Sequence, residues 1–260
     1  MILIGYSVWI EPYQIDVRHL YIKDAGIEKA LAGKTAVHLS DLHMNTIGKR
    51  EEKILDIIAD LKPDLIFLTG DYIKWNGDYE PALTFLSRLR APIGVWAVMG
   101  DYDYSCSKKS CLFCHEQGSG KPTNRHKVRF LRNEMERISL PDGYIWIGAI
   151  DKDGEPDFIS DEEPGFLKDK IPAIILSHSP LIFDYIDKDK NVFILAGDTH
   201  GGQIRLPRWL WHIMGYEKCA RYNQGLFWEG RKKMYVSRGI GTSHFPVRFL
   251  NPPEVAVFHF

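Results

Sequence analysis

The sequence lacks an excess of charge of either sign. Among its 260 residues, 33 lysines and arginines stand against 34 aspartates and glutamates, so the formal net charge is −1. Such a balance provides no global field that would attract nucleic acid or a strongly acidic substrate. The chain is also long enough to bury a sizeable core. Because the overall charge indicates no partner, function must be argued from local features.

Cysteine is scarce, and three of the four cysteines fall in one short segment: Cys106, Cys111, Cys114 and Cys219. A core of this size needs no disulfide framework, so we expect free thiols and a reducing compartment. Together with Cys106 and His115, the Cys111-x-x-Cys114 pair could bind zinc. No second CxxC completes a tetrahedral set, so a loop that merely contains thiols is the other interpretation.

No hydrophobic run is long enough to span a membrane. The opening stretch "MILIGYSVWIEPY" is short and ends at Glu11 and Pro12, and it does not have the pattern of a signal peptide. Either the chain is soluble, or an anchor precedes Met1 in the parent gene. We expect a cytoplasmic protein, with peripheral contact at the inner face of the membrane.

The first hundred residues alternate between apolar runs and amphipathic segments. The expected strands are 13–22, 35–40, 64–70 and 93–100, and the expected helices are 49–62 and 79–90. Strands that alternate with helices at this spacing favour parallel pairing through right-handed crossovers.

The rest of the chain is richer in strands. We expect a polar surface insertion at 105–126, a helix at 126–137, and strands at 143–151, 172–180, 191–203, 232–241 and 253–260. No internal repeat and no linker divides this pattern. The sequence therefore predicts an α/β protein with one domain over residues 1–260.

Five of the apolar strands end in ionisable side chains. The residues concerned are Asp41 and His43 in "HLSDLH", Asp71 in "FLTGD", Asp101, Tyr102 and Asp103 in "VMGDYD", His178 in "ILSHS", and Asp198 and His200 in "LAGDTH". The carboxyl ends of parallel strands share one edge of a sheet, where ligands bind. We therefore expect these side chains to converge in space.

A crowd of histidines and aspartates at one edge needs a compensating cation. Histidine nitrogen with carboxylate oxygen suits zinc, iron or manganese better than calcium, and a pair of metals bridged by a carboxylate can clamp phosphoryl oxygens. A single aspartate or histidine at a strand end is more often a turn or cap residue. That interpretation fails for the whole set, whereas His38 is expected to be an ordinary core histidine.

The motifs "DLH", "GD", "GDYD", "SH" and "GDTHGGQ", in this order, resemble those of the calcineurin-like metallophosphoesterases. That family has D-x-H, G-D, G-N-H-D/E, H and G-H-x-H. The segments "THGGQIRLP" and "YVSRGIGTSHFPVRFLNPPEV" resemble its membrane-associated phosphodiesterase branch, which includes UDP-2,3-diacylglucosamine pyrophosphatases. The resemblance implies two packed mixed β-sheets flanked by helices, a four-layer sandwich with metals at one edge.

The resemblance also implies roles for individual residues. Asp41, His43 and His200 would hold a first metal, Asp71 would bridge, and His178 would bind a second metal. A metal-bridging hydroxide would then hydrolyse a phosphodiester or pyrophosphate bond.

Three positions depart from the family pattern. Asp101 replaces an asparagine and Asp198 replaces a histidine, and both can still ligate the second metal through oxygen. Their hardness favours manganese over zinc. Tyr102 replaces the histidine that usually protonates the leaving group, and with a reference pKa near 10 it is a poor acid at neutral pH. A pyrophosphate, whose leaving group is good, needs less help.

The segment 204–225 is rich in aromatic and basic residues. It is either a helix packed on the core or a lid that touches lipid or headgroups. We expect a phosphorylated small-molecule or lipid substrate and no nucleic acid partner, and the oligomeric state stays open. The alternative to an enzyme is a catalytically impaired protein of the same fold that binds metal or a phosphorylated ligand.

Overall fold

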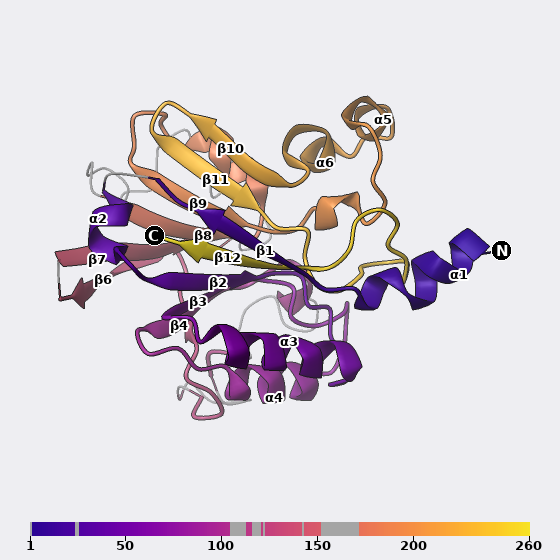
Figure 1. Ribbon diagram of the computed structural model, residues 1–260, viewed down its shortest axis with the longest axis horizontal. Coiled ribbons are helices and arrows are strands. Elements are labelled where there is room, and N and C mark those ends of the chain that lie inside the picture. The colour runs from indigo at the N-terminus through magenta and orange to yellow at the C-terminus, as the bar shows by residue number, and fades with distance from the viewer. Residues whose placement is uncertain are drawn as a thin grey trace.

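The computed structural model describes residues 2–23, 26–104, 113–115, 121, 123–141, 143–151 and 172–260. Its centre is a pair of six-stranded mixed β-sheets packed face to face, with helices outside (Figure 1). The predicted fold class is therefore confirmed.

The first sheet has the order β1-β12-β2-β3-β4-β5. Its strands are β1 (Asp16–Tyr21), β12 (Glu254–His259), β2 (Thr35–Leu39), β3 (Leu65–Thr69), β4 (Gly94–Val98) and β5 (Arg129–Phe130). From β2 to β4 the neighbours are parallel, as the alternation of strands and helices predicted, with Ala36 opposite Leu65 and Leu65 opposite Gly94. The short β5 extends the parallel pairing. The C-terminal β12 lies between β1 and β2, parallel to the former and antiparallel to the latter.

The second sheet has the order β10-β11-β9-β8-β7-β6. Its strands are β10 (Gly225–Glu229), β11 (Lys232–Val236), β9 (Val192–Ala196), β8 (Ala173–Ser177), β7 (Gly143–Ile150) and β6 (Glu134–Leu140). The four central strands are parallel, and a hairpin flanks them at each edge. The sequence did not predict β10.

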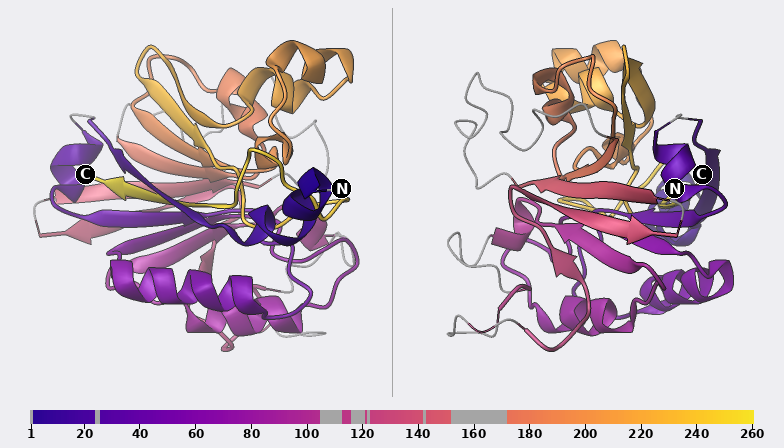
Figure 2. Two further views of the ribbon diagram at one scale, coloured as in Figure 1. Left: turned by 45° about the vertical axis from the view of Figure 1, so that its right-hand side comes forward. Right: turned by 90° about the vertical axis from the view of Figure 1, so that its left-hand side faces the viewer.

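Alternation along the buried strands supplies three apolar layers. In β2, Ala36 faces the core between the two sheets, while Val37 and Leu39 face the outer core under the helices. The helices α3 (Lys49–Leu61) and α4 (Glu80–Arg88) cover that outer face (Figure 2). On the far side of the second sheet, a third cluster packs against the 3-10 helix η5 (Pro180–Tyr185).

The helix α3 forms where the sequence predicted it. Its apolar face is buried through Ile54, Leu55 and Ile58, and Glu51 accepts a hydrogen bond from the backbone N–H of Gly48 at its start (2.9 Å). Lys62, in the left-handed conformation, ends the helix before Pro63. A short connection then leads from the end of α3 at Leu61 to the start of β3 at Leu65.

The helix expected at 126–137 is wrong. Residues 129–130 form β5, and β6 begins at Glu134 and pairs antiparallel with β7 from Glu134 opposite Ala149 to Leu140 opposite Gly143. The Pro-Asp-Gly sequence after Leu140 is a turn signal that favours a hairpin, and pairing with β7 overrides the helical propensity of the segment before it. Most of the insertion expected at 105–126 lies outside the described residues.

The cysteines differ from expectation. Cys114 is disulfide-bonded, whereas Cys219 is a free and buried thiol. The expectation of free thiols is therefore wrong for Cys114, because a large core does not prevent a loop cysteine from being bridged. Cys106 and Cys111 lie outside the described residues.

Two helices that the sequence did not predict precede β2, namely α1 (Ile2–Trp9) and α2 (Ile27–Leu31). The 3-10 helix η1 (Glu11–Tyr13) joins α1 to β1, so the predicted strand at 13–22 begins later, at Asp16. Within the described part of the chain, no helix combines the length and the apolar character that a membrane crossing requires.

Candidate metal centre

The ionisable strand ends meet, and they come from both sheets. Asp41 and His43 follow β2, Asp71 follows β3, Asp101 follows β4, His178 follows β8, and Asp198 and His200 follow β9. We expected a single sheet edge. The site lies instead where the carboxyl ends of the two sheets approach each other.

Hydrogen bonds join the two sheets at this point. The backbone N–H of Asp198 donates to both carboxylate oxygens of Asp41, at 3.1 and 3.2 Å, and the Nδ1 of His178 lies 2.7 Å from the carbonyl of Thr69. Gly197 permits the approach, because a Cβ there would lie 1.8 Å from Oγ of Ser40. The second sheet thereby fixes ligand candidates of the first.

Asp41, His43 and His200 form one group, in which each side chain offers a donor atom within 4.8 Å of the others. All three are buried. The Nε2 atoms of His43 and His200 lie 3.0 Å apart, and Nε2 of His200 lies 3.6 Å from Oδ1 of Asp41. Burial lowers the pKa of His43 to about 4 and that of His200 well below its usual value, so both rings are neutral donors.

Asp41, Asp71 and His178 form a second group by the same measure. Oδ2 of Asp71 lies 3.4 Å from Nε2 of His43 in the first group and 3.5 Å from Nε2 of His178 in its own group. Asp41 belongs to both groups, so the two groups adjoin.

The second group contains a buried nitrogen without a hydrogen bond. Nδ1 of His178 faces the Thr69 carbonyl, and its Nε2 has no hydrogen-bond partner although it points toward Asp71. Burial alone would lower the pKa of His178, but Asp71 outweighs it and raises that pKa well above normal. A buried nitrogen beside a carboxylate is a position that attracts a cation, so the residues present fit a divalent metal.

Asp101 and Asp198, the two residues that depart from the family pattern, are partly buried and belong to neither group. Asp198 is not isolated, because Oδ2 of Asp198 accepts a hydrogen bond from Nζ of Lys218. Sequence reasoning missed Lys218. It lies on α6 (Glu217–Tyr222), within the segment expected to be a lid or a core helix.

The backbone is unusual at the candidate ligands. Five of them have positive φ angles, namely Asp41 (53°), His43 (43°), Asp71 (56°), Asp198 (72°) and His200 (52°). Residues other than glycine adopt this left-handed region only at a cost, and such residues cluster at functional sites. The strain supports a functional rather than a structural reason for these side chains.

Tyr102 lies above the first group rather than in it. Its ring makes an edge contact with His43 (centroids 4.7 Å apart) and with exposed Trp75 (5.6 Å), and its backbone N–H donates to Oδ1 of Asp71 (2.9 Å). Burial, followed by Asp71, raises the pKa of Tyr102, so its hydroxyl keeps its proton. The ring of His244 lies 6.3 Å away, an exposed histidine that the sequence did not single out.

Asp103 supports the site without entering it. Its carboxylate accepts hydrogen bonds from the backbone N–H groups of Asp71, Tyr72 and Gly100, each at 2.8 Å. It therefore ties the loop after β3 to the loop after β4. Burial, followed by the nearby Asp71, raises the pKa of Asp103 to about 8.

A buried arginine orders a second loop beside the site. The guanidinium of Arg248 donates to the backbone carbonyls of Gly241, Arg238, Gly239 and Asn251. These bonds order the loop between β11 and β12, which packs on the "DLH" segment through the bonds from Ile240 N to Ser40 O and Gly241 N to Asp41 O.

Buried imidazole and carboxylate donors at the joined ends of two packed mixed sheets define a metal-dependent hydrolase site. The sequence pattern of the calcineurin-like phosphoesterases matches residues 34–201, which is more than half of the chain. The chain belongs to this family.

Named relatives extend beyond the matched region. The uncharacterized metallophosphoesterase YkuE of Bacillus subtilis is 31% identical and covers 98% of this chain and 88% of its own length. The UDP-2,3-diacylglucosamine pyrophosphatase LpxG of Chlamydia trachomatis is 27% identical over 87% of this chain and 83% of its own. The phosphodiesterase YaeI of Escherichia coli is 26% identical over 97% and 91%.

Proposed function

We propose that the chain hydrolyses a phosphodiester or pyrophosphate bond at a centre that holds two divalent metal ions. The observation that carries the proposal is the buried convergence of Asp41, His43, Asp71, His178 and His200, whose donor atoms fall into two adjoining groups. Pyrophosphatase and phosphodiesterase relatives support the same reaction type.

In this proposal Asp41, His43 and His200 would hold the first ion, Asp71 would serve both ions, and His178 would hold the second. Asp101 and Asp198 would complete the second subsite. Two bound cations would supply activation of the attacking water and neutralisation of charge on the phosphoryl group. Four carboxylates match the charge of two divalent cations, and their oxygens favour manganese over iron or zinc.

The chain itself positions the ligands. Asp103 ties together the loops after β3 and β4, and Arg248 orders the loop that packs on the segment carrying Asp41 and His43. Tyr102 covers His43 and presents a protonated hydroxyl. As catalytic residue, Tyr102 would donate a hydrogen bond to the leaving group, which suffices only where that group leaves easily.

The test is reconstitution. Chelator-stripped full chain should hydrolyse bis-p-nitrophenyl phosphate only after metal is added, fastest with manganese. The Asp71→Asn variant should be inactive under every metal, with Asp187→Asn as a matched control on an exposed loop. Turnover by stripped protein without metal, or by Asp71→Asn with it, would refute the proposal.

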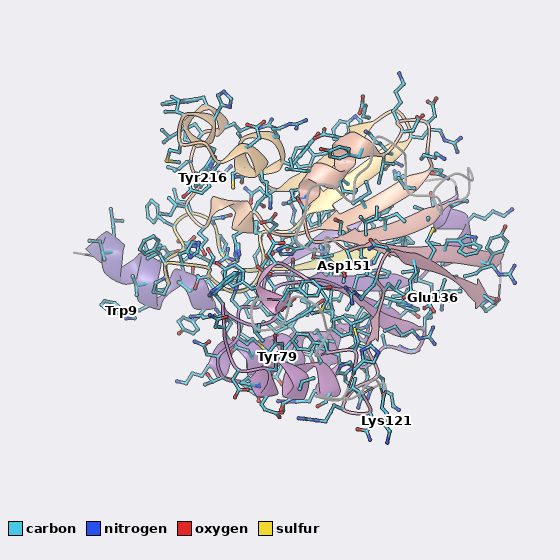
Figure 3. All side chains as sticks on the ribbon, turned by 180° about the vertical axis from the view of Figure 1, so that it is seen from behind. Trp9, Tyr79, Lys121, Glu136, Asp151 and Tyr216 are labelled. Atoms are coloured by element: carbon cyan, nitrogen blue, oxygen red, sulfur yellow. The ribbon has the colours of Figure 1, made fainter. Side chains whose placement is uncertain are left out.

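We propose further that the substrate is amphiphilic and is taken from a membrane surface. Exposed apolar side chains gather at the end of the molecule that carries the centre: Trp9 (73% exposed) on α1, Trp209 (63%) and Ile213 (72%) on α5 (Arg208–Ile213), and Phe245 (72%) between β11 and β12. Figure 3 shows Trp9 and Tyr216 at the same end, opposite Glu136. We call these residues the apolar rim.

Hydrogen bonds connect the parts of the apolar rim. The backbone N–H of Arg248 donates to the Ser7 carbonyl of α1 (2.9 Å), and Phe249 pairs with Gln203 and Arg205 just before α5. Exposed Arg205 and Arg208 add positive charge beside the aromatic residues. Aromatic and basic residues together suit an anionic membrane interface.

Vesicle flotation tests the rim. The wild type should float with vesicles that contain anionic lipid, and Trp209→Ser with Ile213→Ser should reduce the bound fraction without changing hydrolysis of the soluble diester. The substrate itself is tested by comparing UDP-2,3-diacylglucosamine with a nucleotide sugar that lacks acyl chains. Protein that stays entirely in the soluble fraction would count against membrane contact through the apolar rim.

The Cys114 disulfide removes the argument for a cytoplasmic location that rested on free cysteines. The proposal therefore concerns contact with a membrane and not the side of the membrane.

One observation favours a second function. Asp101 and Asp198 are assigned to the second subsite and Tyr102 lies against His43 of the first, and three departures at one centre fit a protein that binds metal or a phosphorylated ligand without turnover. Two bound ions and no hydrolysis of any diester or pyrophosphate would decide for binding.

A further inference from the structure

A lysine reaches the second subsite from the segment that the sequence suggested as a lid. Nζ of Lys218 donates a hydrogen bond to Oδ2 of Asp198, and the two side chains are 29% and 17% exposed. The contact is therefore partly shielded from water and less screened than a surface ion pair.

The helix α6 is fixed against the ligand loop by more than this lysine. The Sγ of Cys219 lies 3.7 Å from the Thr199 carbonyl, and the Oγ1 of Thr199 donates to the Asn223 carbonyl (2.5 Å). These contacts of α6 therefore hold Lys218 beside Asp198.

The ammonium of Lys218 lies directly on a carboxylate oxygen of Asp198, in a contact that is partly shielded from water. Asp101 and Asp198 are the two positions where this chain carries an extra carboxylate relative to the family pattern. Lys218 offsets one of these two negative charges.

The first subsite has no such direct partner. Within the described residues, no lysine or arginine lies within ion-pair distance of Asp41, and the buried Arg248 acts on Asp41 and His200 only from farther away. The two subsites therefore differ in whether an ammonium or guanidinium is in direct contact with a carboxylate.

We infer that the ammonium of Lys218 competes with a divalent cation for Asp198, so that the two subsites bind metal with unequal affinity. The inference rests on the proposed metal centre. A metal that uses Asp198 must displace Lys218, whereas a metal at Asp41, His43 and His200 displaces no fixed charge.

The inference is tested by titrating the chelator-stripped full chain with manganese. Calorimetry measures the binding, and electron paramagnetic resonance distinguishes free from spin-coupled Mn²⁺. The wild type should bind one ion tightly and a second at least about tenfold more weakly. Lys218→Met keeps the length of the side chain and removes its charge. It should tighten the second ion about tenfold, and the spin-coupled signal should appear at a lower metal concentration.

Two variants serve as controls. Lys218→Arg keeps the charge and can pair with a carboxylate in a bidentate manner, so it should leave the second ion as weak as in the wild type or weaker. Arg221→Met removes a positive charge from the same helix, where Arg221 pairs with Asp184 (2.7 Å), and should leave both affinities within about twofold of wild type. Where Lys218→Met does not fold, Lys218→Gln, which still reaches Asp198, gives the same comparison.

The outcomes separate the two proposals. If no ion binds the wild type tightly, the metal centre itself fails and the inference fails with it. If the first ion binds tightly but Lys218→Met leaves the second unchanged or weakens it, the inference alone is overturned, and Lys218 is a structural partner of Asp198.

Discussion

The two halves of the metal centre balance their charge differently. Asp41, His43 and His200 are buried side chains whose neutral rings and single carboxylate face one another. The half that we propose around His178, Asp101 and Asp198 carries more carboxylates, two of them partly exposed, and receives Lys218 from a separate helix. The candidate ligands therefore come from strand ends, whereas the cation beside Asp198 comes from a helix outside the sheets.

We expect the largest effect from substituting Asp71, the carboxylate that both halves of the centre share. Oδ2 of Asp71 lies between His43 and His178, so Asp71→Asn weakens both subsites at once. We expect loss of metal and a fall in diester hydrolysis beyond the roughly 10- to 100-fold typical of outer-shell substitutions. Metal content after gel filtration and the rate under saturating manganese measure it; retention of two ions would contradict the assigned place of Asp71.

A second change sharpens the difference by restoring an acid. Tyr102→His places an imidazole at the edge of His43, where the tyrosine hydroxyl keeps its proton because burial raises its pKa. We expect a gain that approaches 10²-fold for esters with poor leaving groups and little gain for p-nitrophenolate, since general acids contribute about 10² to 10⁴. Tyr102→Phe shows what the hydroxyl itself contributes. An equal effect on good and poor leaving groups would contradict an acid role.

A third change loosens the loops without touching a donor atom. In Asp103→Asn an amide replaces one acceptor oxygen, so one of the N–H groups of Asp71, Tyr72 and Gly100 faces a donor. We expect a loss of about 1–3 kcal/mol in unfolding free energy and about 10- to 100-fold in metal affinity. Asp78→Asn is the control, because that exposed carboxylate accepts a local bond from the Glu80 N–H and ties no two loops together among the described residues. Equal effects of the two substitutions would contradict a positioning role.

The smallest effect concerns a histidine that belongs to neither half. His38 is buried between the sheets, 2.8 Å from Oγ1 of Thr69, and burial lowers its pKa from 6.5 to about 3. Between these values the unfolded chain binds a proton that the native state does not. The stability contributed by neutral His38 is therefore present above pH 6.5 and is lost as the pH falls.

The His38→Gln variant removes this proton uptake and keeps a hydrogen-bonding side chain. Below pH 6.5 its unfolding free energy should fall less steeply than that of the wild type, by up to about 1.4 kcal/mol per pH unit. Denaturant titrations at pH 5, 6 and 7 measure the slope. Parallel slopes would mean that His38 is protonated in the native state.

The sequence predicted the strands and the gathering of their ends from local pattern, whereas the pair of packed sheets followed from the family resemblance. Apolar runs of β-formers give strands, and the carboxyl ends of parallel strands gather at one end of their sheet. It placed no strand at 134–140, because "RFLRNEMER" has helical propensity and only pairing with β7 decides against it. That pairing depends on tertiary contacts, which outweigh propensity.

The same limit applies within the site. Asp71 and His178 were identified from their positions after strands, but Lys218 follows Asp198 by 20 residues on a segment whose placement no motif indicates. Asp103 was recognised as part of "GDYD", yet its work as an acceptor for three backbone groups depends on how two loops meet. Ligands that follow strands can be predicted, whereas partners that arrive from elsewhere in the chain cannot.

The left-handed backbone at Asp41, His43, Asp71 and His200 has a consequence for how such a protein can change. Glycine adopts this conformation without steric cost, so a substitution such as His200→Gly removes a ligand and relaxes the chain at the same time. At these positions, the residue that binds metal is not the residue that gives the most stable backbone. Variants selected only for resistance to heat should therefore acquire glycine at these positions and lose metal binding while they keep the fold.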